Sequence, residues 1–116
     1  MPLVEVTYAP HVPEQTLHRL GDVLPQLVSE AVECPEEPWD GDLRPGDVEI
    51  RFRPLGPFDR SGLDFVIEVR SKWFPSRDAN RTQRADLLHE SVASATGLSD
   101  FGVYLTFPTA SWSQGD

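Results

Sequence analysis

Met1-Pro2-Leu3-Val4-Glu5-Val6-Thr7-Tyr8 combines a proline next to the first methionine with a short strand pattern. Even-numbered positions of residues 3–8 carry Val, Val and Tyr, and odd-numbered positions carry Leu, Glu and Thr. This period of two is typical of a β-strand with two different faces. Proline is ordinary at the first position of a strand, because its missing N–H is not needed there. Removal of Met1 would instead give Pro2 a free secondary amine, and an α-amino group titrates near pH ~7.7–8.0. Pro2 is thus either a simple strand start or a catalytic base.

The composition predicts one compact, acidic domain. The chain has 116 residues, of which 39% are apolar, enough for a modest core. A formal charge of −9 argues against binding to nucleic acid or to an anionic membrane, since both need a basic surface. The single cysteine, Cys34, cannot form an internal disulfide, which favours a reducing, cytoplasmic location. We see no apolar run of the roughly 20 residues that a membrane span needs, and no basic-then-apolar leader.

Helix and strand patterns alternate along the rest of the chain. The expected elements are a helix from about Pro13 to Ala31, a strand over Asp47–Arg53, a strand over Leu63–Arg70, a helix over Asp78–Thr96 and a strand over Asp100–Phe107. Both helices are predicted from apolar residues at three- and four-residue spacing, and Gly97 is a typical helix stop. The order strand, helix, strand therefore occurs twice.

This order predicts an α+β fold built from two βαβ units related by a pseudo-twofold axis. Each crossover should be right-handed with its two strands parallel, which gives a four-stranded mixed sheet with two helices on one face. We expect a single domain over residues 1–116, with repeat one at about 2–54, repeat two at about 63–107 and a tail at 108–116. The uncovered sheet face mixes acidic and basic residues, which suits either a solvated face or the centre of an oligomer.

Residues 34–46 form an acidic, proline- and glycine-rich loop between the first helix and the second strand. Their carboxylates match the spacing of no calcium loop, so a solvated run of charge is the better interpretation. The three histidines, His11, His18 and His89, also lack the spacing of metal ligands. The sequence therefore predicts no metal site.

A cluster of cations is expected close to Pro2. If the two first strands are adjacent and antiparallel, the Pro2 nitrogen faces the loop that carries Arg70, Lys72 and Arg77. Nearby cations disfavour a protonated amine and lower its pKa, and arginine binds a carboxylate with a bidentate fork. Trp73 would supply an apolar wall. The alternatives are an Arg70 ion pair with a sheet glutamate, a surface Arg77 at the helix start and a Trp73 that only covers the core.

Pro2 directly after Met1, the short strand that follows it, the long helix and the second βαβ unit together resemble the tautomerase superfamily, whose members are built from βαβ units. The residues 64–69, Asp-Phe-Val-Ile-Glu-Val, followed by Ser76-Arg77-Asp78 at a helix start, are similar to the 5-carboxymethyl-2-hydroxymuconate isomerase branch. The tail Ser111-Trp112-Ser113-Gln114-Gly115 is similar to the ending of malonate semialdehyde decarboxylase-like members. Two departures are Pro10-His11-Val12 in place of a Glu-Gly-Arg turn, and the wide separation of Arg70 and Arg77. The separation of the two arginines favours tautomerisation over decarboxylation or dehalogenation, and the missing turn arginine favours a non-catalytic relative.

The resemblance implies a cofactor-independent tautomerase or isomerase acting on a small 2-keto or 2-hydroxydienoate carboxylic acid. Pro2 would be the general base and acid, Arg77 with Arg70 or Arg44 would bind the carboxylate, and Trp73 would line the site. The resemblance also implies a homotrimer. The alternatives are a catalytically silent oligomeric module of the same fold, for binding or structure, and an unrelated ferredoxin-like domain.

Overall fold

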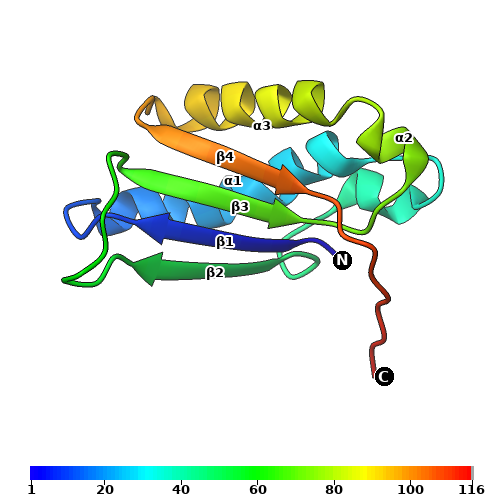
Figure 1. Cartoon of the computed structure of the whole chain (residues 1–116), viewed down its shortest axis with the longest axis horizontal. Coiled ribbons are helices and arrows are strands. Elements are labelled where there is room, and N and C mark those ends of the chain that lie inside the picture. Colours follow the sequence, from blue (N-terminus) through cyan, green and yellow to red (C-terminus); the bar gives the residue numbers. More distant parts are fainter. Residues whose placement is uncertain (116) are drawn as a thin grey trace.

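Two layers, a four-stranded sheet and the helices on one of its faces, make up the computed structural model, which describes residues 1–115 (Figure 1). The strands are β1 (Leu3–Tyr8), β2 (Glu49–Pro54), β3 (Phe65–Arg70) and β4 (Phe101–Thr106). The helices are α1 (Glu14–Val32), the 3-10 helix η1 (Pro38–Asp42), the short α2 (Pro75–Asp78) and α3 (Arg81–Thr96). The predicted four-stranded mixed sheet with two main helices on one face is therefore confirmed.

The strand order β2-β1-β3-β4 contains two parallel pairs that meet at an antiparallel pair. β1 pairs with β2 in parallel, and β3 pairs with β4 in parallel. The two first strands, β1 and β3, are adjacent and antiparallel, with Leu3 opposite Arg70. The predicted arrangement of two βαβ units is thus correct, and the beginning of β1 lies beside the end of β3.

The main differences from the predicted boundaries lie before the second long helix. That helix begins at Arg81 rather than at Asp78, and the preceding residues form the separate turn of α2. Pro75 starts α2, because proline has the φ angle of a first helical residue and needs no N–H there. Asn80, with φ −127°, breaks the helical path between the two. In the same way Pro38 begins η1 inside the segment predicted to be a loop.

The core lies between the sheet and the helices. The central strands contribute side chains of alternate residues that are almost fully buried, namely Val4, Val6, Phe65, Ile67 and Val69. They pack against the apolar stripe of α1, which includes Leu20, Leu24 and Val28, and against Leu88 and Val92 of α3. The period-two and helical patterns of the sequence therefore meet in one core. No helix in the described part of the chain is long and apolar enough to cross a membrane.

The opposite sheet face is charged and uncovered. Glu5 of β1 and Glu68 of β3 are direct cross-strand partners, an arrangement in which like charges repel. Arg53 binds Glu5 at 2.6 Å, and Arg70 binds Glu68 at 2.8 Å, so each glutamate has its own cation. Tyr104 on the outer strand β4 is paired with Glu68 and is 69% exposed on the same face. The face is therefore polar, electrically balanced and free of helices.

α3 ends just before Gly97, whose left-handed backbone conformation favours glycine. Gly97 caps this helix with φ 73°, a left-handed conformation that costs other residues about 1–2 kcal/mol. We expect Gly97→Ala to lower the free energy of unfolding by about 1 kcal/mol, measured by urea denaturation. Gly62→Ala is the matched control, because that glycine has open space around its Cβ position and no positive φ. An equal effect of the two substitutions would contradict this interpretation of Gly97.

Candidate functional site

Four segments of the chain meet at one edge of the sheet and enclose a pocket of about 700 Å³. α1 runs back along the sheet, so the loop that follows it, with η1, returns to the beginning of β1 (Figure 1). β3 is antiparallel to β1 and ends at the same edge, and β4 ends beside β3. The pocket is lined by Met1 and Leu3, by residues of the segment 37–47, by residues 70–72 and by the tail residues 108–114.

Pro2 is buried at the base of this edge, between Met1 and Leu3, which both line the pocket. The carbonyl of Pro2 accepts a hydrogen bond of 3.2 Å from the Glu49 backbone N–H, which extends the β1–β2 ladder by one residue. The pyrrolidine ring is therefore fixed by the sheet. While Met1 is attached, the Pro2 nitrogen is a tertiary amide and has no basic lone pair. A free amine at this position requires cleavage of the Met1–Pro2 bond.

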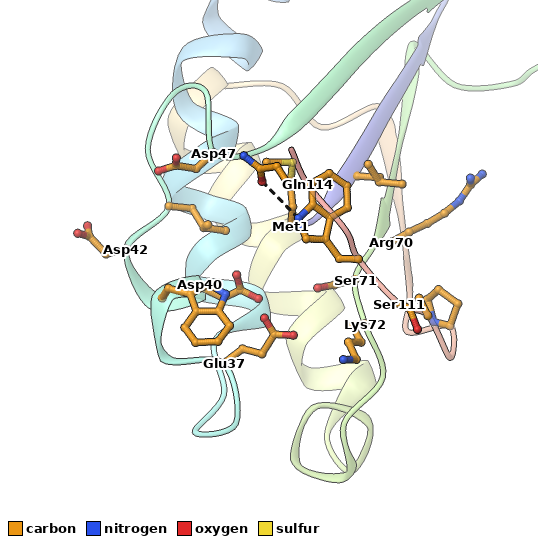
Figure 2. A pocket seen from close by; sticks show the side chains of 16 residues that line it. Met1, Glu37, Asp40, Asp42, Asp47, Arg70, Ser71, Lys72, Ser111 and Gln114 are labelled. Atoms are coloured by element: carbon orange, nitrogen blue, oxygen red, sulfur yellow. Dashed lines mark hydrogen bonds between the residues drawn. The ribbon is translucent and has the colours of Figure 1, made fainter. Parts of the chain in front are cut away.

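Arg70 lines the pocket at the end of β3, but its guanidinium extends away from the other lining side chains (Figure 2). Its Nη2 donates to both carboxylate oxygens of Glu68, at 2.8 and 3.1 Å. This hydrogen bond, and then the charge of Glu68, raises the pKa of Arg70. Because the pair is exposed and water competes for both groups, it holds the Arg70 side chain only weakly.

Lys72 lies two residues beyond Arg70 on the same pocket wall. Its ammonium is 5.5 Å from the centre of the Phe74 ring, a distance typical of a cation–π contact. Within residues 1–115 it takes part in no ion pair with a carboxylate. Figure 2 shows Lys72 and Ser71 on one side of the pocket, with Glu37 and Asp40 on the other. Lys72 is thus a cation that a ligand in the pocket can reach.

Arg77 is completely buried behind the pocket and does not line it. Its Nη2 binds Asp40 Oδ2 at 2.7 Å, and its Nε donates to the Val32 carbonyl at 2.6 Å. Its Nη1 donates to Ser71 Oγ at 3.1 Å and to the Lys72 carbonyl at 2.8 Å. A buried charge needs such partners, because its loss of hydration is costly. The guanidinium therefore joins the end of α1, η1 and the loop after β3.

Asp40, the partner of Arg77, has one oxygen without a partner. Its side chain is almost fully buried and lines the pocket. Oδ2 binds Arg77, whereas Oδ1 has no hydrogen-bond partner among the described residues. The local fold that places Asp40 depends on Ser29, whose hydroxyl donates to the Asp40 carbonyl and accepts from the Leu43 N–H. The pocket wall thus contains a buried carboxylate with only one of its two oxygens hydrogen-bonded among the described residues.

The remaining predicted site residues, Arg44 and Trp73, are outside the pocket lining. Arg44 is exposed, binds Asp42 at 3.2 Å and borders a second cavity of about 380 Å³. Trp73 is 43% exposed, and its backbone N–H donates to the Pro108 carbonyl at 2.9 Å, which holds the start of the tail. Among residues 1–115 no group of three or more His, Cys, Asp or Glu side chains is placed to hold a metal ion.

Glu37 and Asp40 belong to the segment predicted to be a solvated run of charge, and Trp39 was not predicted as a site residue, yet all three line the pocket. A signal for them existed in the topology. In a βαβ unit the loop after the helix leads into the second parallel strand, so it returns to the edge at which the first strand begins. Segment 34–46 therefore had to lie beside Pro2. Trp112 was noted only for its likeness to a family tail, and it lines the same pocket.

The buried ion pair predicts a large stability effect. Arg77→Ala removes four hydrogen bonds and leaves Asp40 as a buried charge without a partner. We expect a loss of about 3–5 kcal/mol in the free energy of unfolding, measured by urea denaturation with tryptophan fluorescence. Arg81→Ala is the matched control, since Arg81 makes an exposed ion pair with Asp78 and should change stability by less than about 1 kcal/mol. A loss at Arg77 no larger than at Arg81 would show that the pair is not a structural anchor.

No protein-family model and no curated protein matches the sequence of this chain. Solved structures do match its fold. A malonate semialdehyde decarboxylase aligns with a TM-score of 0.66 and 16% identity, over 98% of this chain and 91% of that chain. A fused 4-OT symmetric trimer aligns with a TM-score of 0.59 and 14% identity, over 92% and 85% of the two chains. The macrophage migration inhibitory factor-like protein of Entamoeba histolytica aligns with a TM-score of 0.58 and 12% identity, over 93% and 89%.

These neighbours are members of the tautomerase superfamily. The chain therefore has the tautomerase fold, as its sequence predicted, with malonate semialdehyde decarboxylase among its structural neighbours. Identities of 12–16% establish the fold of the chain.

Proposed function

We propose that this protein is a cofactor-independent tautomerase that uses the amine of Pro2 as general base and acid on a small 2-keto or 2-hydroxydienoate carboxylic acid. One observation supports this most directly. Leu3, the first residue of β1, is paired with Arg70, the last residue of β3, so the chain start lies at a pocket that also contains Lys72. A potential base and a carboxylate-binding cation thus border the same pocket.

In the proposed reaction the neutral Pro2 amine takes a proton from the carbon next to the substrate carbonyl. The enolate that forms is protonated at another position by the same group, now an ammonium, so no proton is gained or lost overall. An α-amine titrates near pH ~7.7–8.0, so both of its forms are present close to neutral pH. The ring of Pro2 is held by the β1–β2 ladder, which limits the movement of the base between the two steps.

The other proposed roles follow from side-chain placement. Lys72 binds the substrate carboxylate and opposes the negative charge that develops on the enolate oxygen. Arg70 adds a second cation at the same end of the ligand when it turns away from Glu68. Arg77 acts indirectly by holding Ser71, the Lys72 backbone and Asp40 in place. Trp39 and Trp112 supply apolar surface around the substrate.

A second candidate function is a catalytically silent binding or structural module with the same fold. It applies if Met1 is retained, because Met1 lines the pocket and its peptide bond removes the basicity of the Pro2 nitrogen. The two candidates therefore differ in one covalent bond. Mass spectrometry of the purified protein distinguishes a chain that starts at Met1 from one that starts at Pro2.

Blocking the amine tests the proposed catalyst. We expect protein with a free Pro2 amine to ketonise phenylenolpyruvate, followed by ultraviolet absorbance. Protein that retains Met1 should lose at least about 10²-fold in kcat/KM, the usual contribution of a general base. Pro10→Ala, at an exposed proline in a turn, is the control and should keep its activity. Equal turnover by the forms with and without Met1 would rule out the Pro2 mechanism.

We also propose that the chain forms a homotrimer through its uncovered sheet face. The trimeric fused 4-OT neighbour supports this, as does a helix-free face on which acidic and basic residues are balanced. Light scattering after size exclusion should give a molar mass of three times the 13.0 kDa chain. Because the face is charged, Arg53→Glu should shift the population toward monomer, whereas Arg60→Glu, on the exposed loop before β3, should not. A wild-type mass of one chain at micromolar concentration would contradict the trimer.

A further inference from the structure

The cations at the pocket are unequally available to a ligand. Arg77 is fully buried and bonded to protein groups, and Arg44 lies outside the lining. Arg70 is turned away and bonded to Glu68 (Figure 2). Lys72 lines the pocket without an ion pair in the described part of the chain. Within the described residues, Lys72 is therefore the lining cation that a carboxylate can bind without first breaking an ion pair.

The side of the pocket opposite Lys72 offers acceptors. Glu37 is half-buried, lines the pocket and makes no ion pair within residues 1–115. Asp40 also lines the pocket, and its buried Oδ1 has no hydrogen-bond partner among the described residues. A buried acceptor without a partner is unfavourable and is normally satisfied by a ligand or a bound water. Both groups call for a donor and repel another carboxylate.

We propose that the pocket selects a small monocarboxylic acid with a hydroxyl or ammonium group at the end remote from its carboxylate. Lys72 binds the carboxylate, Glu37 accepts directly from the remote donor, and Asp40 Oδ1 accepts from it or from a water that it holds. A dicarboxylic acid of the same length is rejected, because its second carboxylate would meet Glu37. This selectivity rests on the proposed function of the same pocket, but it is a property of binding and is measured without turnover.

Four ligands with the same number of carbon atoms separate the effects of the first carboxylate, the remote donor and a second carboxylate: butanoate, 4-hydroxybutanoate, 4-aminobutanoate and succinate. Binding to protein without Met1 is measured by titration calorimetry and by the fluorescence of Trp39 and Trp112, which line the pocket. The Pro2 amine and one carboxylate are common to all four complexes, so their mutual attraction does not decide the order of binding. We expect at least one donor-bearing acid to bind about tenfold tighter than butanoate, and succinate to bind more weakly than butanoate. The comparison of the two donor-bearing acids decides between a hydroxyl and an ammonium group.

Charge-neutral variants assign the two ends of the ligand. Glu37→Gln should remove most of the advantage of the donor-bearing acid and should strengthen succinate binding by several-fold. Lys72→Gln should weaken all four ligands. Glu36→Gln is the matched control, because this neighbouring carboxylate accepts from Ser76 Oγ outside the pocket lining. It changes the same charge in the same loop and should leave the order of the four ligands unchanged.

Three results would overturn the proposed selectivity: succinate binding as tightly as the donor-bearing acids, an unchanged ligand order in Glu37→Gln, or no binding of any of the four. Each result leaves the proline mechanism intact if phenylenolpyruvate is still turned over. Conversely, the predicted order of ligands without turnover would support the pocket's selectivity and contradict the tautomerase proposal. The two ideas therefore fail separately.

Discussion

The buried ion pair between Arg77 and Asp40 holds the pocket together. Its guanidinium contacts the end of α1 through the Val32 carbonyl, the 3-10 helix through Asp40 and the loop after β3 through Ser71 and the Lys72 carbonyl. Val32 and Asp40 lie 45 and 37 residues from Arg77 along the chain, whereas Ser71 and Lys72 lie 6 and 5 residues from it. A buried charge pair is only weakly stabilising compared with apolar packing, but breaking it is costly. It therefore specifies how the loops lie more than it adds to overall stability.

Much of the sheet was predictable because its residues obey one local rule. Alternation in residues 3–8 and 63–70 identified the faces of β1 and β3, and the repeated strand–helix–strand order gave their antiparallel pairing. The register places Leu3, the first residue of β1, opposite Arg70, the last residue of β3. Where local pattern and overall fold agree in this way, the sequence alone predicts the strand faces and their pairing. The placement of the Pro2 position beside the end of β3 was obtained in this way.

The use of each charged side chain was not predictable by the same rule. A guanidinium at a helix start is compatible with solvent, with a ligand or with the interior, and the choice for Arg77 depends on Asp40 from a loop 37 residues away. That loop has no periodic pattern, and its 3-10 turn was unrecognised, so Asp40 was assigned to solvent. Arg70 was easier, because Glu68 is two residues before it on the same strand face, and this pairing was one of the alternatives considered. Long-range polar contacts, unlike apolar periodicity, leave little trace in local sequence.

The division of work between Arg77 and Lys72 also has a chemical reason. Arginine has five N–H donors in a rigid plane, so one residue can join several segments that approach from different directions. Lysine has a compact charge on a flexible stem, which suits a ligand whose position changes during a reaction. All three guanidinium nitrogens of Arg77 donate to protein groups, so the side chain has a structural role. Its bonds to Ser71 and to the Lys72 carbonyl also fix the backbone that carries the Lys72 side chain at the pocket. The scaffold cation thus sets the position of the cation that is left for a ligand, while the β1–β2 ladder sets the position of Pro2. The proposed base and its counter-charge are thus held by two independent parts of the fold without contact between them, an arrangement that suits the proposed proton transfer next to a carboxylate.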